Sequence, residues 1–326
     1  MKINSCGLRT IGILSAGLLT FLLATALVFS WLVNRQLRDY EIYAYNQNAP
    51  GSYAQLKGYD IHFQLFGSPT SDPGEIPVML IHGFASSGLE YSRLAPLLAD
   101  HHSLIIPDLL GFGYSQRLKQ PNPALSHRGQ AALLKDLLET LGVQQVDVVG
   151  ASYGGGIAAQ FALDYPERVR QLVFIDAEVF GEASNRAYIA YLPLGLNRAL
   201  TWYALGGGPI AQKLVELSCH DVLACERAGE LSRARESITR IQGNTDALIA
   251  FSQTPRDQRI PNDLANIAQP SLVVWGERDE ILPENYAPRL ANILNASLQW
   301  IPEAGHTPHI ERSELVAALL LDFLSQ

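Results

Sequence analysis

The fold of this chain is decided by one stretch of sequence, residues 146–159, which reads VDVVGASYGGGIAA. Its opening residues are typical of a buried strand, and the small residues that follow are typical of a tightly packed helix. Gly150 and Gly154 allow a sharp backbone turn between the two, which leaves the Ser152 hydroxyl exposed at the N-terminus of the helix. We therefore predict a strand, a turn and a helix with Ser152 as a candidate nucleophile. An ordinary glycine-rich turn is the alternative.

A serine nucleophile needs two partners, a base that takes its proton and a carboxylate that orients the base. Both residue types follow Ser152, in the order Ser, Asp, His, and each comes just after an apolar run typical of a strand. Open α/β sheets form their sites at the carboxyl ends of parallel strands. We therefore predict a catalytic triad of Ser152, Asp279 and His306. Asp176, at the end of the strand after the nucleophile helix, is the alternative acid.

Two backbone N–H groups are expected to form an oxyanion hole, because a tetrahedral intermediate needs donors that are already in place around its oxygen. Tyr153 follows the nucleophile and supplies one N–H group. The other is expected from Phe84, in the loop after the apolar run at residues 78–82. A plain turn is the alternative interpretation of that loop. We assign Asp108, after the next apolar run, a structural role.

Apolar runs and helical patterns alternate along most of the chain. Strands are predicted at residues 59–65, 78–82, 104–107, 146–150, 172–175, 272–275 and 298–301. Helices, recognised by apolar residues three and four apart, are predicted at residues 127–141, 154–163 and 313–324. This alternation favours a mostly parallel sheet covered on both faces. Residues 178–261 lack a strong strand pattern, and helix-like segments near 186–192, 209–217 and 228–240 indicate an inserted lid or binding region.

The N-terminal segment is expected to cross a membrane. Residues 11–33 contain no charged side chain, and a helix of that length, at about 1.5 Å per residue, spans a hydrocarbon core of about 30 Å. A buried core helix is one alternative, although such helices are usually shorter. A signal peptide cut at Ala24-Thr25-Ala26 is another, although its apolar region would be only about 7–15 residues. We predict an uncleaved anchor within residues 1–38 and a polar connector over residues 36–49.

The composition excludes several classes of protein. The 326 residues are 48% hydrophobic and 17% charged, which excludes a disordered chain, and 3 Cys are too few for a disulfide scaffold. The net charge is −8, and the first 38 residues hold only basic charges, so the body that follows is more acidic still. Phosphate backbones would repel such a body, and we predict no nucleic-acid partner.

Together, these motifs resemble the α/β-hydrolase family. The matching stretches occur in family order and cover about residues 53–324: His82-Gly83-Phe84, Asp108-x-x-Gly111-x-Gly113-x-Ser115, Gly150-x-Ser152-x-Gly154-Gly155, Tyr165-Pro166-Glu167-Arg168-Val169, Gly276-x-x-Asp279 and Gly305-His306. The resemblance implies an eight-stranded, mostly parallel sheet with a helical cap inserted after the sixth strand. It divides the chain into a core of residues 50–177 and 262–326 and a cap of residues 178–261. With its anchor, the chain is similar to membrane-anchored monoacylglycerol-lipase-like members.

The resemblance also implies an activity, the hydrolysis of carboxylic esters through an acyl-enzyme. A lipid-like or medium-chain ester would be the small-molecule substrate, and the membrane would be bound through the N-terminal helix. No cofactor and no metal are expected. Ser152 argues against dehalogenases and epoxide hydrolases, which carry Asp at that position. The alternatives are a carbon–carbon bond hydrolase of acidic dienones, a haloperoxidase-like perhydrolase, and a binding protein on a catalytically dead fold.

Aromatic and apolar side chains are the candidates for a substrate pocket. Tyr91 stands where many relatives carry a Trp, in the segment after the His-Gly loop. The inserted region contributes further candidates, which are Tyr188, Tyr191, Leu192, Trp202 and Phe251. The alternative for these residues is that they form the core of the cap itself.

Two cysteines of the inserted region indicate the side of the membrane, because the charges flanking the anchor barely decide its orientation. A turn between Cys219 and Cys225 could bring their Cα atoms within the roughly 4.4–6.8 Å that a disulfide needs. Such a bond persists only in an oxidising compartment. We predict this disulfide and a catalytic domain outside the cytoplasm, with two buried free thiols as the alternative. His220 lacks partners at zinc-binding spacing, so no metal is expected there.

Overall fold

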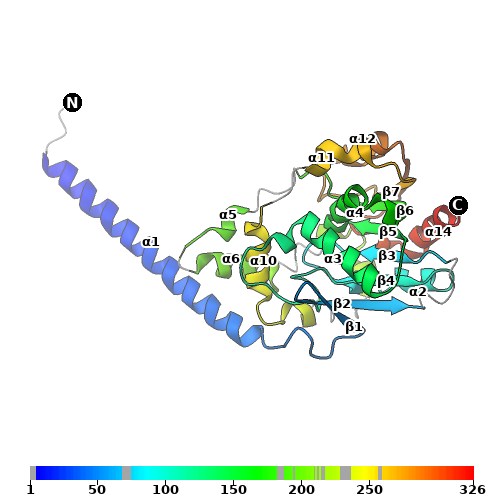
Figure 1. Ribbon diagram of the computed structural model, residues 1–326. Coiled ribbons are helices and arrows are strands. Elements are labelled where there is room, and N and C mark those ends of the chain that lie inside the picture. Colours follow the sequence, from blue (N-terminus) through cyan, green and yellow to red (C-terminus); the bar gives the residue numbers. More distant parts are fainter. Residues whose placement is uncertain are drawn as a thin grey trace.

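Eight strands form one sheet at the centre of the molecule (Figure 1). The computed structural model describes residues 5–67, 75–181, 187–193, 195–208, 210, 213, 217–227, 236–255 and 259–326. The strands are β1 (Ser52–Leu56), β2 (Tyr59–Phe66), β3 (Val78–Ile81), β4 (Leu104–Pro107), β5 (Val146–Ala151), β6 (Val169–Ile175), β7 (Ser271–Gly276) and β8 (Ser297–Ile301). Their order across the sheet is β1-β2-β4-β3-β5-β6-β7-β8. β2 is antiparallel to β1 and β4 and the other neighbours are parallel, which confirms the predicted sheet.

The apolar runs in the sequence mark every one of these strands except β1. β1 lies at the edge of the sheet, and only Ala54 and Leu56 of its residues are buried. Because buried and exposed residues alternate in it, the strand contains no continuous apolar run. The resemblance to the family, and not the residue pattern, supplied the eighth strand.

Helices cover both faces of the sheet. On one face lie α3 (His127–Thr140), α4 (Tyr153–Asp164) and α12 (Tyr286–Leu294), and on the other lie α2 (Leu94–Ala99) and α14 (Ser313–Leu324). A short helix, α13 (Pro308–Glu311), precedes α14, and 3-10 turns occupy Gly88–Tyr91, Pro123–Leu125, Pro166–Arg168 and Leu264–Asn266. The first core lies between the sheet and α3, α4 and α12, and the second core lies between the sheet and α2 and α14. Successive side chains of β3 enter opposite cores, Met79 the first and Leu80 the second. The central strands are therefore buried on both faces.

The described part of the segment between β6 and β7 contains several helices joined by turns, as expected for an inserted cap. Its helices are α5 (Ala187–Ala190), α6 (Leu196–Leu205), α8 (Val222–Arg227), α10 (Asn244–Gln253) and α11 (Arg259–Asp263). α5 is shorter than the helix predicted at 186–192. The helix predicted at 209–217 lies mostly outside the described residues. Of the one predicted at 228–240, only residues 236–240 are described, and 236–239 are helical.

The N-terminal helix α1 (Ser5–Tyr40) projects from the body (Figure 1) and is longer than expected. Residues Gly17–Tyr40 are long and apolar enough to cross a membrane, a property that a signal sequence shares. The predicted polar connector from residue 36 was wrong at its start, because the helix continues to Tyr40. Val33 and Leu37 are buried against α6, where Ala199 and Trp202 pack on them. This contact with the cap keeps the last turns of α1 helical.

Cys219 and Cys225 form a disulfide bond, which confirms the predicted pairing. Cys219 is buried and Cys225 is half-buried against Ile310. The bond closes a short loop in the cap, because Cys219 precedes α8 and Cys225 lies within it.

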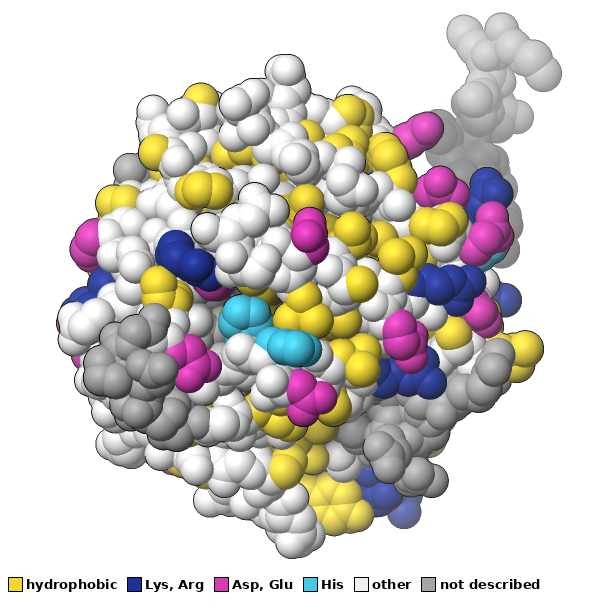
Figure 2. Space-filling view, turned by 90° about the vertical axis from the view of Figure 1, so that its right-hand side faces the viewer, with side chains coloured by type: hydrophobic (Ala, Val, Ile, Leu, Met, Phe, Trp, Pro, Cys, Tyr) yellow, Lys and Arg dark blue, Asp and Glu magenta, His cyan; other side chains and the backbone are white. Residues whose placement is uncertain are grey.

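The face of the molecule that points away from α1 carries side chains of both charges, spread over its surface (Figure 2). Oppositely charged side chains also pair on the exposed surface, as Arg278 does with Glu303 at 3.3 Å. Such a mixture is typical of a surface in contact with water.

Candidate active site

Ser152 lies at the sharp turn between β5 and α4. Its backbone φ is +50° and its ψ is −118°, a strained conformation for a residue with a side chain. The turn is possible because two neighbours lack side chains. A Cβ on Gly150 would lie 2.5 Å from the carbonyl oxygen of Gly154, and a Cβ on Gly154 would lie 2.2 Å from that of Ile81. The predicted strand, turn and helix are therefore present, with Ser152 before the first residue of α4.

His306 lies between Ser152 and Asp279. Its Nε2 is 2.9 Å from the Ser152 Oγ, and its Nδ1 is 2.9 Å from the Asp279 Oδ2. The other oxygen of Asp279 accepts the N–H groups of Ile281 and Leu282, at 2.8 and 3.2 Å. Burial opposes ionisation of Asp279, but the His306 ring and these N–H groups outweigh it, and the pKa of Asp279 lies below its usual value. The carboxylate is thus ionised and fixed, as an orienting group must be.

Asp176 lies close to Asp279 and His306, but it is Asp279 that forms the hydrogen bond to the His306 ring. Its Oδ1 accepts the N–H of Gly276 at 3.0 Å, and its side chain is fully buried at the end of β6. Burial, and then the charge of Asp279, raise the pKa of Asp176 well above its usual range. Asp176 therefore holds its proton more tightly than Asp279 does, and it is Asp279 that contacts the imidazole.

The loop after β3 lies against the nucleophile. A Cβ on Gly83 would be only 3.3 Å from the Cβ of Ser152, so this loop passes directly beside it. The Gly83 N–H donates to the buried carboxylate of Glu90 at 3.1 Å, which fixes the loop from behind. Phe84 follows in this loop and Tyr153 opens α4. These positions keep both residues as the predicted oxyanion donors. Glu90 was missed, because a lone acid carries no sequence signal for such a role.

Aromatic rings pack against Tyr153, the residue that follows Ser152, and against one another. Phe251 comes from α10 of the cap, and its ring centre is 5.1 Å from that of Phe84, 5.4 Å from that of Phe112 and 5.1 Å from that of Tyr153. Phe251, Tyr153 and Leu125 also line a small cavity with Ser126, His127, Thr254 and Pro255. Phe251 therefore stays a candidate pocket residue. Phe112 was missed, although it lies between Gly111 and Gly113 in a loop that the sequence marked as important.

Two predicted pocket residues were wrong because their side chains are buried elsewhere. Tyr91 is fully buried in the second core, where its hydroxyl donates to the Ile81 carbonyl at 2.8 Å. Trp202 packs against Val33 and Leu37 of α1. Each ring serves a contact between elements, which the residue pattern alone does not distinguish from a pocket wall.

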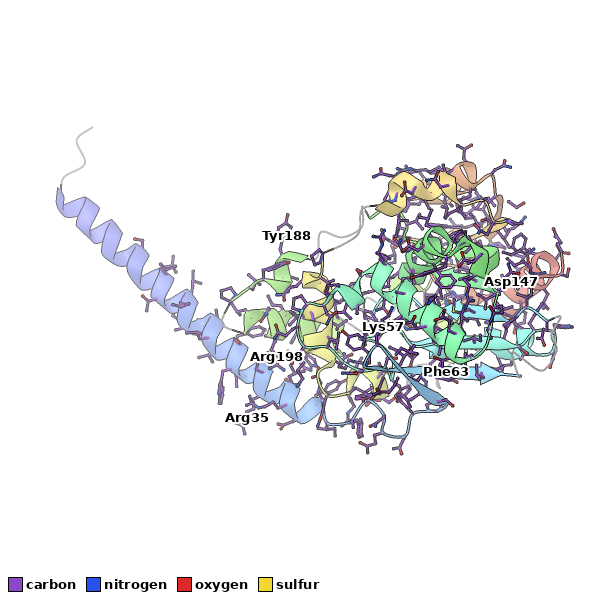
Figure 3. The ribbon with its side chains drawn as sticks, in the orientation of Figure 1. Arg35, Lys57, Phe63, Asp147, Tyr188 and Arg198 are labelled. Carbon is purple, nitrogen blue, oxygen red and sulfur yellow. A yellow bond between two sulfur atoms is a disulfide. The ribbon has the colours of Figure 1, made fainter. Side chains whose placement is uncertain are left out.

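Three other predicted pocket residues were wrong because they lie on the outer surface. Tyr188, Tyr191 and Leu192 have exposed fractions of 79%, 64% and 37%. In Figure 3, Tyr188 points outward from α5, away from the core. The sequence showed that the cap is aromatic but not which way these side chains face.

Two groups of donor atoms in the described part of the chain are close enough to share a metal ion. One comprises Cys219, Cys225 and Glu311, but the two cysteines are bonded to each other. The other comprises Asp176, Asp279 and His306, but the His306 Nδ1 is already hydrogen-bonded to Asp279. Neither arrangement offers a complete set of open ligands, and we keep the prediction that the site uses no metal.

Two proteins of similar sequence are named as hydrolases. The chain is 29% identical to the 2-hydroxymuconate semialdehyde hydrolase of Pseudomonas putida, over 86% of this chain and 98% of that protein. It is 30% identical to the 2-hydroxymuconate semialdehyde hydrolase of Pseudomonas sp. strain CF600, over 86% of this chain and 96% of that protein.

Solved structures share the same fold. A thermophilic esterase from Thermogutta terrifontis superposes with a TM-score of 0.68 at 24% identity, over 85% of this chain and 98% of that one. The 2-hydroxy-6-oxo-6-phenylhexa-2,4-dienoate hydrolase of Rhodococcus sp. strain RHA1 gives 0.69 at 20% identity, over 84% and 98%. The sequence model of the alpha/beta hydrolase fold matches residues 76–313. This match covers well over half of the chain, which therefore belongs to the α/β-hydrolase family.

Proposed function

We propose that this hydrolase acts through Ser152, with His306 as its base and Asp279 as the orienting acid. The observation that carries the proposal is the position of His306, whose two ring nitrogens are each 2.9 Å from one partner. This is within the reach that proton transfer requires. A binding protein on a dead fold would not need to keep all three groups in register.

The proposed mechanism has two halves. His306 takes the Ser152 proton while Oγ bonds to the substrate carbonyl carbon, and the N–H groups of Phe84 and Tyr153 hold the oxyanion. The intermediate collapses, the bond to the leaving group breaks, and His306 returns the proton to that group. A water molecule, deprotonated by His306, then attacks the acyl-enzyme and releases a carboxylic acid and free Ser152. Asp279 stabilises the imidazolium in both halves.

The first candidate for the bond that breaks is a carbon–carbon bond. Relatives that align over almost their whole length are named as 2-hydroxymuconate semialdehyde hydrolases. These relatives support the carbon–carbon alternative over the ester that we first expected. The substrate would be a dienoate ring-fission product, and the leaving carbon would take the proton from His306.

An ester is the second candidate, favoured by the aromatic rings around Tyr153. These rings, Phe84, Phe112 and Phe251, are uncharged, whereas the carboxylate of a dienoate would need a cation or several N–H donors. An apolar acyl chain fits such rings directly. A helix able to cross a membrane would also bring the site close to lipid-like esters.

One assay distinguishes the two candidates. The full-length protein in detergent is given 2-hydroxymuconate semialdehyde, whose visible absorbance is lost on cleavage, and a series of p-nitrophenyl esters. A higher kcat/KM for the dienoate supports carbon–carbon hydrolysis, and a higher value for the esters supports the second candidate. Ser152→Ala should lose either activity by several orders of magnitude. Equal rates for the wild type and Ser152→Ala would contradict the proposal.

We further propose how the chain is organised. Residues 1–38 anchor it in a membrane through one helix, residues 50–177 and 262–326 form the catalytic core, and residues 178–261 form a cap. The Cys219–Cys225 disulfide supports a catalytic domain outside the cytoplasm, because such a bond is lost in a reducing compartment.

A further inference from the structure

The loop that carries His306 lies directly against the cap loop that the disulfide closes. We call residues 303–312 the histidine loop and residues 218–225 the disulfide loop. The backbone N–H of His306 donates to the Ser218 carbonyl at 2.9 Å. The loops meet closely at Gly305, where a Cβ would be 2.7 Å from the His220 backbone nitrogen. The disulfide loop is therefore in contact with the backbone of the proposed base.

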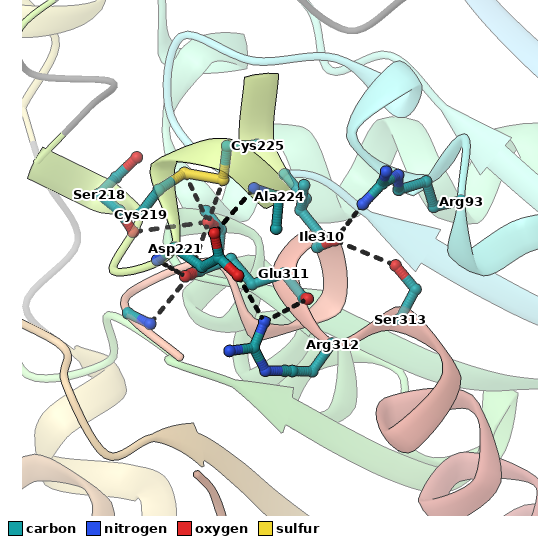
Figure 4. Close-up of a disulfide and its surroundings, with 12 residues drawn as sticks. Arg93, Ser218, Cys219, Asp221, Ala224, Cys225, Ile310, Glu311, Arg312 and Ser313 are labelled. Carbon is teal, nitrogen blue, oxygen red and sulfur yellow. Dashed lines mark hydrogen bonds and ion pairs between the residues drawn. A yellow bond between two sulfur atoms is a disulfide. The ribbon is translucent and has the colours of Figure 1, made fainter. Parts of the chain in front are cut away.

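A buried carboxylate joins the two loops. Glu311, which is 5% exposed, accepts the Gly305 N–H at 2.9 Å with one oxygen and the Asp221 N–H at 2.7 Å with the other. The Thr307 hydroxyl also lies 3.3 Å from the first of these oxygens. Charge-assisted bonds of this kind are stronger than neutral ones. Glu311 thus fixes the residues on both sides of His306 to the disulfide loop. Figure 4 shows Glu311 beside Asp221 and the disulfide.

An arginine makes a second connection between the loops. Arg312 donates to the Glu303 carbonyl at 2.8 Å and pairs with the Asp221 carboxylate at 3.2 Å. Asp221 therefore receives contacts from both Glu311 and Arg312. Its position depends on a loop whose regular structure is the beginning of α8, a six-residue helix too short to be stable alone. The disulfide is the covalent bond that holds the two ends of this loop together.

We propose that the disulfide loop is a positioning element for His306, so that the hydrolase loses turnover when Cys219–Cys225 is reduced. The inference rests on the proposed role of His306. A dithiol reductant would break the S–S bond, deliver two electrons and two protons to the two sulfurs, and itself become a disulfide. The freed loop would withdraw the Ser218 carbonyl and the Asp221 N–H from the histidine loop. Cys225 is half-buried, whereas Cys219 is buried.

The test compares the oxidised and reduced states of the full-length protein in detergent. Dithiothreitol reduces the bond, mass spectrometry of the alkylated protein verifies the thiols, and circular dichroism verifies the fold. A displacement of about 1 Å at a catalytic group can cost about 100-fold in rate, so we expect kcat to fall at least about tenfold with KM nearly unchanged. Reoxidation should restore kcat. Unchanged kcat in the reduced, folded protein would overturn the proposal.

A pair of variants tests the same link with the disulfide intact, in case reduction unfolds the protein. Glu311→Gln should lower kcat and leave KM unchanged, because the amide cannot accept both N–H groups. Glu314→Gln, an exposed acid in the first turn of α14, is the matched control and should match the wild type. Wild-type kcat in Glu311→Gln would overturn the proposal. A fluorophosphonate that fails to label the oxidised wild type would instead overturn the function proposed for Ser152.

Discussion

Asp176 and Asp279 are neighbouring acids whose pKa values are shifted in opposite directions. Asp279 is bonded to His306 and has a lowered pKa, whereas the pKa of Asp176 is raised by burial and by the charge of Asp279. The two residues are therefore not interchangeable. The Ser, Asp, His order had favoured Asp279, and the contact with His306 gives a physical reason for it.

Replacing these acids by amides should separate their roles. Asp279→Asn should lower kcat by about 10³–10⁴-fold, because the amide stabilises the wrong imidazole tautomer. Asp176→Asn should keep most activity, because Asp279 holds the His306 Nδ1 and an amide oxygen at residue 176 can still accept the Gly276 N–H. Steady-state kinetics of both variants is the measurement. A larger loss in Asp176→Asn would move the orienting role to that residue.

The raised pKa of Asp176 also predicts how stability depends on pH. The unfolded chain loses this proton near 3.8, whereas the folded protein keeps it to a higher pH. Above 3.8 the folded state therefore binds more protons, and stability falls as pH rises toward the folded pKa. In Asp176→Asn, the free energy of unfolding should fall less steeply as the pH rises. Urea unfolding of both proteins between pH 5 and pH 7 measures it, and parallel curves would show that Asp176 does not contribute.

The sequence predicted Ser152, Asp279 and His306 as one site because each follows a strand and lies in a short motif with small residues, and the structure brings the three side chains into contact. The sequence did not identify most of the pocket. Tyr91 and Tyr188 are both aromatic, yet one is buried in the core and the other is 79% exposed. That difference depends on how elements distant in sequence pack together, which no local pattern encodes.

At the scale of elements, the end of α1 and the start of α10 are joined by one carboxylate. Glu41 follows α1 and is buried, and it accepts the N–H groups of Gly243 and Thr245 at 3.0 and 2.7 Å. These groups lie at the N-terminus of α10, which has no capping bond from the side chain of its N-cap residue, a glycine. Glu41, which follows α1, therefore supplies the acceptor for the N-terminal N–H groups of α10.

Removing the Glu41 carboxylate should lower the stability of the folded protein. Glu41→Ala should lower the free energy of unfolding by about 1–2 kcal/mol, since two buried N–H groups lose their acceptor. Asp39→Ala, an exposed acid two residues earlier, is the matched control. Urea unfolding of both variants checks this. Equal stability would show that water replaces the carboxylate without cost.

The boundaries of elements were less predictable than their existence. The helix at the N-terminus was expected from its uncharged run, but its continuation to Tyr40 depends on Leu37 packing against α6. α6 lies about 160 residues further along the chain. The edge strand β1 was missed for a related reason, because an alternating pattern of five residues is a weak signal.

At the scale of the whole molecule, α1 extends away from the body, and the contacts described between the two lie near the end of the helix. Arg35 lies on this last part of α1 and points away from the body (Figure 3). The exposed large apolar side chains nearer the N-terminus include Leu18, Leu19, Phe21 and Leu22. Such a helix is suited to a lipid environment, while its last turns remain with the cap.

The full-length protein should remain in the membrane fraction after alkaline carbonate and high salt, because burial in hydrocarbon does not depend on ionic strength. A truncated chain that begins at Ser30 keeps Val33 and Leu37 and should be soluble and active. One that begins at Asp39 loses both contacts with Trp202 and should have a lower Tm. Fractionation and thermal unfolding measure these effects. Release of the full-length protein by carbonate would contradict the anchor.

The central claim, that Ser152 is a nucleophile activated by His306, is tested most directly by a fluorophosphonate probe and peptide mapping. The probe is added to the full-length protein, and mass spectrometry identifies the modified residue. We expect the adduct on Ser152 in the wild type, no adduct in Ser152→Ala, and labelling slowed by orders of magnitude in His306→Ala. An adduct on another residue, or equal labelling of the wild type and Ser152→Ala, would contradict the account.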